Sequence, residues 1–456
     1  MNANWPPWVW IYKNKRSPES MKIVKVYSEN VRRYGFWFVD ALTGGHVRKY
    51  LHDLKEKLGG EADASSDDLI KILNHAVNTT EFYSEYKGYS NIMDFPVIKK
   101  SLVKEKYDQF ISSEYKTEKL YKVQTSGSTG ERFVMLLNKK KRKRVIAELI
   151  YFLEQCGFKL GYRHVYARVW FAGNKKAKLE LIAHNTIMFD CSFLSDESMD
   201  MLYQMLHKDN SIKCLTGYAT FLATIASYFD KKGYTPDMFS IEIVISGAER
   251  LEPGAKILLK KVFGCTVVSR YGNSENGFLA QQTNDGDKFI LNTAHYFFET
   301  LKLDSDEPAS LGEPARLVLT DLYNYAMPLI RYDTEDIVIM EISAENSYRK
   351  YILTELSGRK ADIIYDTRGN KISPHFVALT FRRYDKLPQF QLIQNSLKQF
   401  TLKLEGTRGL YDDNDFKETI RELVGPDAIV EIEYVDKIPH LSSGKFRKII
   451  CNYKVN

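Results

Sequence analysis

The sequence VQTSGSTGER, from Val123 to Arg132, alternates small hydroxyl residues with glycine. Glycine lets backbone N–H groups approach a phosphate closely, and hydroxyl groups donate hydrogen bonds to its oxygens. The segment lacks the GK[ST] ending of a Walker P-loop, so it does not hold a nucleotide in the P-loop manner. Taken alone it fits either a flexible surface turn or a polyphosphate-binding loop, whose candidate residues are Thr125, Ser126, Gly127, Ser128, Thr129 and Gly130.

Composition limits the class of protein. A chain of 456 residues is too long for one ordinary core and predicts at least two domains. The net charge of +7, from 65 basic and 58 acidic residues, suits an anionic small molecule or a membrane surface as readily as nucleic acid. The five cysteines are far apart and form no CxxC pair, and no segment has the apolar length of a membrane span. We therefore expect a cytoplasmic protein without a disulfide framework.

The order of the expected elements predicts an α/β fold. Residues 1–120 are mostly helical in pattern, and from Tyr121 onward apolar strand-like runs alternate with amphipathic helices. Such alternation predicts layered sheets with parallel strands, in which ligands bind beyond the carboxyl ends of the strands. Three loops fall at such positions: TSGSTG, Ser246 to Glu249, and Tyr271 to Glu275.

The pattern changes twice toward the C-terminus. After about Glu299, shorter β-rich runs predict a small β module, and the last hundred or so residues predict a compact α+β unit. We place the domain boundary near Gly358. The expected domains are a large one over residues 1–357 and a small mobile one over residues 358–456.

Four further segments, together with TSGSTG, carry a resemblance to a known family. YGNSE (271–275), LIRYDTED (329–336), SGRKAD (357–362) and LSSGKFR (441–447) are similar, in order, to four motifs of the adenylate-forming superfamily. The GAE of residues 247–249 and the HYFFE of residues 295–299 are most similar to its phenylacetate:CoA ligase branch, and within that branch to capsule-biosynthesis members of the CapK type.

The resemblance implies an ATP-dependent ligase that activates a carboxylic acid as acyl-AMP and releases pyrophosphate. TSGSTG would hold the departing phosphates, Glu275 would bind Mg²⁺, and Ser274 would contact the α-phosphate. Lys445 would neutralise charge that develops in the transition state. The remaining nucleotide contacts would come from Tyr271 at the adenine, Asp336 at the ribose, Arg359 beside it, and Ser246, Gly247, Ala248, Glu249, Gly272 and Asn273 around the base and phosphates.

Each of these residue types also has an ordinary structural use. Lys445 fits an exposed lysine near a C-terminus, Glu275 and Asp336 fit a helix cap or a surface ion pair, and Tyr271 fits core packing. The motifs also depart from the family pattern. Ala361 stands at the expected hinge position, and Lys448 stands where the terminal motif has arginine.

The acid and the acceptor stay open. The implied acceptors are CoA, a carrier-protein thiol, an amine, or the amine or hydroxyl of a sugar in surface polysaccharide assembly. The alternatives are adenylation of an alcohol or phenol, and a degenerate module that binds a nucleotide without chemistry. An acid pocket is expected around Trp170, Phe171, Tyr218 and Phe221. We expect no structural zinc, because residues 277–299 hold His295 but no cysteine.

The run KKKRKR, from Lys139 to Arg144, is compatible with nuclear import, nucleic acid or anionic lipid. No RNA-binding aromatic motif accompanies it. We interpret it as a solvated face at the start of the following helix, and we expect no nucleic-acid partner.

Overall fold

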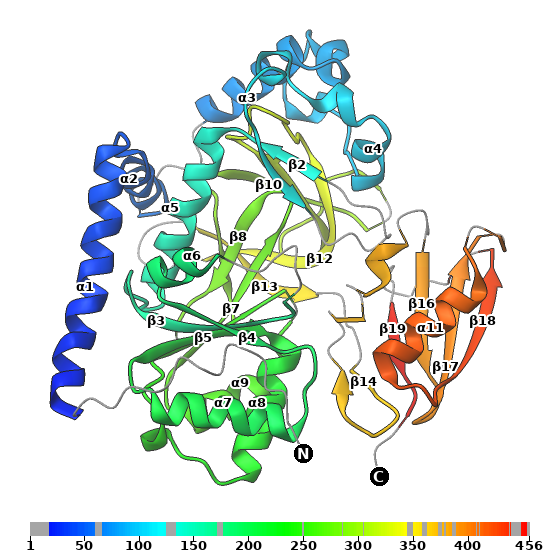
Figure 1. The fold of residues 1–456 in the computed structure, drawn as a ribbon. Helices are drawn as coiled ribbons and strands as arrows, with labels where there is room; N and C mark the ends of the chain where they lie inside the picture. The colour runs from blue at the N-terminus through cyan, green and yellow to red at the C-terminus, as the bar shows by residue number, and fades with distance from the viewer. Residues whose placement is uncertain are drawn as a thin grey trace.

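The computed structural model describes residues 18–59, 66–124, 134–170, 177–248, 250–284, 286–303, 305–343, 350–357, 363–372, 376–377, 380–384, 389–406, 408–409, 411–436, 438 and 448–453. Helices and 3-10 turns come first, helices and strands alternate over residues 121–273, and strands predominate after that (Figure 1). The α-helices are α1 Pro18–Leu42, α2 His46–Gly59, α3 Ser66–Thr79, α4 Lys100–Glu105, α5 Lys139–Gln155, α6 Lys178–Ala183, α7 Asp196–Lys208, α8 Ala219–Lys231, α9 Pro253–Phe263 and α11 Asp413–Val424. Short 3-10 turns are η2 Phe82–Tyr86, η3 Ile92–Asp94, η4 Tyr107–Phe110, η5 Ser113–Tyr115, η6 Pro236–Met238 and η8 Phe381–Arg383.

The strands form a long central sheet and smaller sheets. In chain order they are β1 Tyr121–Gln124, β2 Val134–Leu137, β3 Arg163–Arg168, β4 Thr186–Asp190, β5 Ile212–Tyr218, β6 Ile243–Gly247, β7 Thr266–Asn273, β8 Gly277–Gln282, β9 Phe289–Leu291, β10 Tyr296–Leu301, β11 Pro314–Asp321, β12 Tyr332–Ser343, β13 Lys350–Ser357, β14 Ile364–Tyr365, β15 Lys371–Ile372, β16 Gln389–Gln394, β17 Gln399–Glu405, β18 Ile429–Val435 and β19 Ile449–Cys451.

The central sheet changes character at β7. Its order is β10-β11-β12-β13-β9-β8-β7-β6-β5-β3-β4. Strands β4, β3, β5, β6 and β7 run parallel, whereas β7 pairs with β8 in the antiparallel direction and the remaining neighbours continue antiparallel. The carboxyl ends of the parallel strands therefore lead into the loops beside β8, where a ligand site is expected in an α/β sheet.

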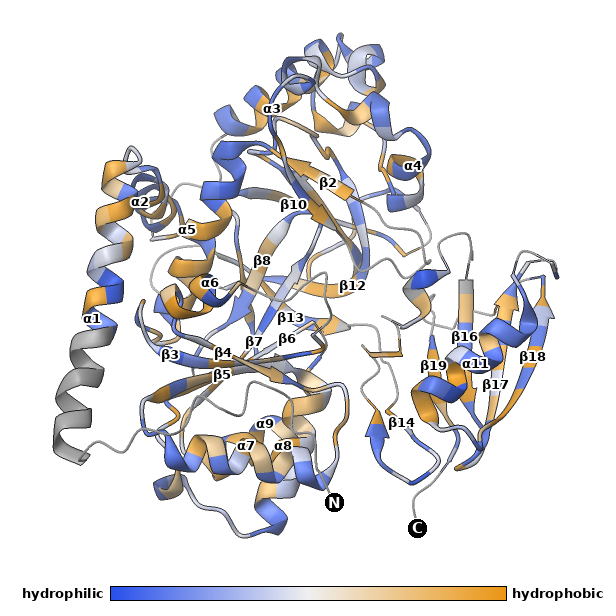
Figure 2. Cartoon of the chain, viewed as in Figure 1, coloured by the Kyte–Doolittle hydropathy of each residue, from blue (hydrophilic) through white to orange (hydrophobic). Residues whose placement is uncertain are grey.

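Helices α7, α8 and α9 cover one face of the parallel strands. Apolar residues such as Leu215, Val244 and Val267 pack there against Leu222, Ile225 and Leu259 of the helices. Because parallel strands are buried on both faces, they carry near-continuous apolar runs. Figure 2 shows this apolar colouring along the central strands, while the helices alternate between apolar and hydrophilic residues.

The C-terminal part has its own core. Its sheet has the order β18-β17-β16-β19, and residues such as Phe400, Leu402, Phe416 and Ile420 pack between this sheet and α11. In Figure 1 it lies to one side of the larger sheet. It touches the rest of the chain where Leu194 N donates a hydrogen bond of 2.7 Å to Lys371 O.

The predicted α/β fold class is confirmed. The helical entry, the alternating strands and helices, and the later β-rich runs all occur in the expected order. Strands β1 and β2 pair antiparallel, from Tyr121 with Leu137 to Gln124 with Val134. The TSGSTG segment connects these two strands and lies outside the described residues.

Candidate active site

The loops after β6 and β7 lie at the carboxyl edge of the parallel sheet. Gly247 ends β6, and Ala248 follows it with a positive φ of 65°. A residue with a Cβ pays a steric cost in this left-handed conformation, and such residues cluster at functional sites. The side chain of Ser246 is fully buried, and its Oγ has no hydrogen-bond partner among the described residues.

Tyr271 and Asp336 meet although they come from different motifs. The Tyr271 hydroxyl donates a hydrogen bond of 2.8 Å to Asp336 Oδ2. Burial, together with the Asp336 charge, raises the pKa of Tyr271 well above its ordinary value, so the phenol stays protonated and donates. The two residues predicted to hold the adenine and the ribose are thus joined directly.

The ring of Tyr271 is also a core residue. It is only 8% exposed and packs with Leu279, Leu319 and Val338. Tyr271 is therefore packed in the core, which is the ordinary structural use expected for this residue. Stacking on an adenine stays a prediction, and it would use the small part of the ring that the core leaves open.

Glu275 lies in the turn between β7 and β8 and is buried. Its Oε1 accepts a hydrogen bond of 2.7 Å from Lys100 Nζ, at the start of α4. The preceding Ser274 is half-buried. The candidate α-phosphate and magnesium contacts thus occupy one turn at the edge of the sheet, next to a cation from the helical entry.

This turn needs a glycine at position 272. A Cβ added to Gly272 would lie 2.5 Å from the backbone oxygen of Gly277, closer than any side chain tolerates. The register of β7 and β8 also shifts between Tyr271 and Gly272. The glycine of the YGNSE motif therefore allows the close approach of the two strands that forms the turn.

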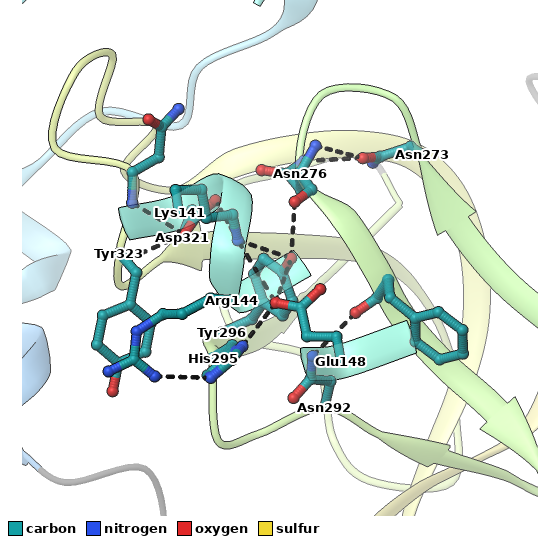
Figure 3. Close-up of polar contacts among 12 residues, drawn as sticks. Lys141, Arg144, Glu148, Asn273, Asn276, Asn292, His295, Tyr296, Asp321 and Tyr323 are labelled. Atoms are coloured by element: carbon teal, nitrogen blue, oxygen red, sulfur yellow. Dashed lines mark hydrogen bonds and ion pairs between the residues drawn. The ribbon is translucent and has the colours of Figure 1, made fainter. Parts of the chain in front are cut away.

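A buried polar network supports the turn that carries Glu275 (Figure 3). Lys141 Nζ donates to the Tyr296 hydroxyl at 2.9 Å, and that hydroxyl donates to the Asn276 backbone oxygen at 2.7 Å. Asn276 in turn donates from its backbone N and from Nδ2 to Asn273 Oδ1, at 2.8 and 3.1 Å. A continuous chain of hydrogen bonds thus connects α5 to the turn that carries Glu275.

The interpretation of KKKRKR as a solvated face is wrong for Lys141. Its side chain is fully buried, and Nζ lies 2.9 Å from Asp321 Oδ2 and 3.7 Å from Glu148 Oε1. Lys139, Lys140 and Arg142 are exposed, as expected. The helix directs two of these six cations inward: Lys141 contacts the buried carboxylates of Glu148 on α5 and Asp321 at the end of β11, and Arg144 contacts Asp53 of α2.

Arg144 is the second inward cation of this run. Its Nη1 donates to Asp53 Oδ2 at 2.7 Å and to His295 Nε2 at 2.9 Å. Because His295 Nε2 accepts, Nδ1 carries the proton and donates to Glu148 Oε1 at 2.6 Å. Burial lowers the pKa of His295 to about 4, so the imidazole is neutral near pH 7. Although burial alone would raise the pKa of Glu148, the charge of Lys141 holds it below its ordinary value.

A second ion pair joins two of the motifs. Arg331, in the LIRYDTED segment, has a positive φ of 52° and places Nε 3.1 Å from Oε1 of Glu299, the last residue of HYFFE. Both side chains are largely buried. The motif arginine therefore fixes β12 to β10 rather than pointing to solvent.

The expected acid-pocket residues divide between core and sheet edge. Trp170 Nε1 donates to Phe189 O at 2.9 Å, and Phe221 is buried in the core beneath α8. Tyr218 ends β5 and is partly buried. Phe221 therefore has a packing role, whereas Trp170 and Tyr218 lie at the carboxyl edge.

Several expected site residues lie outside the described residues. These are the loop residues Thr125, Ser126, Gly127, Ser128, Thr129 and Gly130, together with Phe171, Glu249, Arg359 and Lys445. Their roles stay predictions.

Glu275 offers a metal ion one buried carboxylate. Within the described ranges no group of three or more histidine, cysteine or acidic side chains could hold a metal ion. A single carboxylate at a phosphate site still fits Mg²⁺, which keeps several waters and takes its other ligands from substrate phosphates. Lys100 already occupies one Glu275 oxygen, so Mg²⁺ would share this carboxylate with the lysine.

Sequence reasoning missed Lys100, Lys141, Asn276, Tyr296 and Asp321. Lys141 is seven residues from Glu148 but 180 residues from Asp321 along the chain, and Lys100 is 175 residues from Glu275. A lysine at such a position carries no sequence signal of its own. Only Asn276, which directly follows YGNSE, could have been included from its position.

The chain is similar to CapK and to phenylacetate–CoA ligases over most of its length. A family model described as the CapK C-terminal domain matches residues 364–452. Protein CapK of Staphylococcus aureus is 26% identical over 406 residues, covering 84% of this chain and 87% of that protein. Phenylacetate-coenzyme A ligase of Thermus thermophilus is 25% identical, covering 76% of this chain and 78% of the enzyme.

Solved structures show the same fold. 2-Hydroxyisobutyryl-CoA ligase, in complex with 2-HIB-AMP and CoA, matches with a TM-score of 0.55 and 16% identity, covering 89% of this chain and 90% of that chain. The resemblance to the adenylate-forming superfamily, on the side of CapK and the phenylacetate–CoA ligases, is thereby confirmed. The prediction that the chain is built as an AMP-forming ligase is confirmed with it.

None of the helices in the described part of the chain combines the length and apolar character needed to cross a membrane.

Proposed function

We propose that this protein activates a carboxylic acid with ATP, releases pyrophosphate and passes the acyl group to an acceptor. A carboxylate oxygen attacks the α-phosphorus, and the bond to the β-phosphate oxygen breaks. The acceptor then attacks the acyl carbon, and AMP leaves. CoA is the first acceptor to test because the relatives include phenylacetate–CoA ligases; an amine or hydroxyl of a surface polysaccharide is the second, because CapK is also a relative.

The observation that carries the proposal is the 2.8 Å hydrogen bond between Tyr271 and Asp336. It places two residues of separate superfamily motifs side by side at the carboxyl edge of the parallel sheet. Asp336 offers acceptor oxygens, which ribose hydroxyls require. Glu275 follows Tyr271 by four residues and adds a buried carboxylate suited to Mg²⁺.

The chain's own residues would each supply a separate contribution. Lys100 would bring positive charge to the phosphates beside Glu275, and the TSGSTG hydroxyls would bind the departing pyrophosphate. Lys445 would approach from the C-terminal part and neutralise charge between the carboxylate and the α-phosphate. Mg²⁺, when bound, supplies charge neutralisation to the triphosphate. Movement of the C-terminal part between the two half-reactions belongs to the same proposal.

The test is pyrophosphate release across a panel of aromatic acids, amino acids, uronic acids and dicarboxylic acids, with ATP and Mg²⁺. We expect release that depends on at least one acid, and a Lys445→Ala variant that binds ATP but releases pyrophosphate at least about a hundredfold more slowly. A Lys448→Ala variant is the matched control, since it removes a neighbouring lysine outside the proposed chemistry. The proposal would be contradicted if no acid of the panel stimulated pyrophosphate release, or if Lys445→Ala turned over at an unchanged rate.

A further inference from the structure

Three neighbouring parallel strands place side chains in one row at the predicted acid pocket. Tyr218 of β5 pairs with Gly247 of β6, and Ser246 pairs with Ser269 of β7. The next position along β7 therefore sets Arg270 beside Gly247. Because pairing residues point to the same face of a sheet, Tyr218, Gly247 and Arg270 share one face.

Strand β3 extends the row by one residue. Tyr166 pairs with Thr216, so Arg168 lies beside Tyr218 two positions later. The Arg168 side chain hydrogen-bonds the Tyr218 hydroxyl. The row thus runs Arg168, Tyr218, Gly247, Arg270, with an arginine at each end.

The middle of this row is open. A Cβ built on Gly247 would meet no atom within 4 Å. Gly247 therefore contributes no side chain between Tyr218 and Arg270, and the described residues leave space above it. This space lies at the edge of the sheet where ligands bind in α/β folds.

Arg270 is a half-buried cation without a counterion among the described residues. Its Nε and Nη2 are buried and have no hydrogen-bond partner there. The ionisable groups that act on it are Cys156, Cys214 and Tyr166, and its guanidinium lies 4.9 Å from the ring centroid of Phe278. Burial lowers the pKa of Arg270, but an arginine stays protonated at neutral pH.

An unpaired buried charge is expensive, so its presence calls for an explanation. Leaving one buried partner of an ion pair uncompensated is strongly destabilising. Buried polar groups without partners in a native structure are few, and several of them serve function. A guanidinium with two unpartnered nitrogens is suited to an incoming anion, which it can bind with two parallel hydrogen bonds.

We propose that the acid activated at this site carries a second anionic group, a carboxylate or a phosphate, which Arg270 binds. The inference rests on the proposed function and deepens it by naming the substrate class. Tyr218 forms the neighbouring wall, and Arg168 holds the Tyr218 hydroxyl in place. Aromatic residues at the pocket then flank the carbon skeleton, while Arg270 selects its far end.

The first test compares acids matched in size that differ by one charge: succinate with butyrate, glutarate with pentanoate, and phthalate with benzoate. For the wild type we expect kcat/KM for pyrophosphate release to be at least about tenfold higher with the dianion of a pair. Arg270→Gln should bring the ratio to within about threefold, and Arg270→Lys should keep part of it. Arg408→Gln, an exposed arginine of the C-terminal part, is the control and should leave the ratio unchanged.

Equal rates for the two members of every pair, or an unchanged ratio in Arg270→Gln, would overturn the inference. An equal loss for monoanions and dianions would also overturn it, because Arg270 would then act on the reacting carboxylate common to both.

The second test measures thermal stability without ATP. Succinate, glutarate or phthalate should raise the Tm of the wild type but not that of Arg270→Gln, and ligand-free Arg270→Met should be at least as stable as the wild type. A loss of stability in Arg270→Met without any dianion effect would show a structural role and overturn the inference. If no acid gives pyrophosphate while dianions still stabilise the wild type through Arg270, the proposed function fails and the anion site stands.

Discussion

Lys141 is fully buried and Arg270 is half-buried with two buried nitrogens, and the protein treats the two charges in opposite ways. Lys141 lies among Asp321, Glu148 and the Tyr296 hydroxyl, all within 3.7 Å of its Nζ. Arg270 has no carboxylate among the described residues. A charge that is neutralised from within stabilises the fold, whereas a charge left without a partner at the edge of a site is available to a ligand.

The two positions also differ in what surrounds them. The network of Lys141 is closed, and it ends on the Asn276 backbone, where it fixes the turn that carries Glu275. Arg270 follows Ser269 on β7, beside the strand position of Gly247, and its Nε and Nη2 have no hydrogen-bond partner among the described residues. Lys141 is thus a positioning residue, whereas the proposed role of Arg270 is to select the substrate.

The largest expected effect is on folding, from Lys141→Met. This change leaves Asp321 and Glu148 buried without their cation, and it should lower the free energy of unfolding by about 3–5 kcal/mol. Lys140→Met is the matched control on the same helix, because Lys140 is exposed, and it should change stability by less than about 0.5 kcal/mol. Urea unfolding measures both. Equal effects of the two substitutions would remove the distinction between the inward and outward cations.

The next largest expected effect is a loss of stability at low pH that comes from His295, in the network around Lys141. His295 has a pKa of about 4 in the folded chain and an ordinary value of 6.5, so the unfolded chain takes up the proton first as the pH falls. Stability should be fully present above about pH 6.5 and decline toward pH 4, by up to about 3 kcal/mol. Urea unfolding between pH 7.5 and 4.5 measures this decline.

A His295→Gln variant is the control for that pH series. It keeps hydrogen-bonding capacity but does not titrate, so its stability should fall less steeply than that of the wild type over the same range. Parallel curves for the two proteins would assign the decline to other groups.

The smallest expected effect concerns Tyr271, which follows Arg270 and points to the opposite face of β7. Tyr271→Phe removes the hydrogen bond to Asp336 but keeps the ring in the core, so it should cost about 1 kcal/mol. If that bond orders Asp336 for the ribose, the KM for ATP should rise about fivefold while the preference for dianionic acids stays unchanged. A lost acid preference in Tyr271→Phe would mean that the two faces of β7 are not separate.

Much of the fold could be predicted because the signals are local. Apolar runs such as those of β6 and β7, each followed by an amphipathic helix or a turn, indicate parallel strands wherever they occur. The YGNSE, LIRYDTED and TSGSTG segments could be assigned to strand ends for the same reason. The pairing of Tyr271 with Asp336 was implied only by two motifs that the superfamily uses together.

The burial of single charges could not be predicted, because it depends on partners distant in the chain. KKKRKR looks uniform in sequence, yet the helical period turns Lys141 and Arg144 toward carboxylates and leaves three neighbours in solvent. The proposed role of Arg270 could not be predicted for a related reason. It depends on the absence of a partner among the described residues and on the glycine of the next strand, and neither is visible in the sequence around Arg270.

The most direct test of the central claim follows an oxygen atom. An acid that supports turnover is labelled with ¹⁸O in its carboxylate, and the products are separated and weighed by mass spectrometry. Formation of an acyl-AMP followed by acyl transfer predicts that one ¹⁸O ends in AMP and none in pyrophosphate. Label in inorganic phosphate, or AMP without any label, would contradict acyl adenylation by this protein.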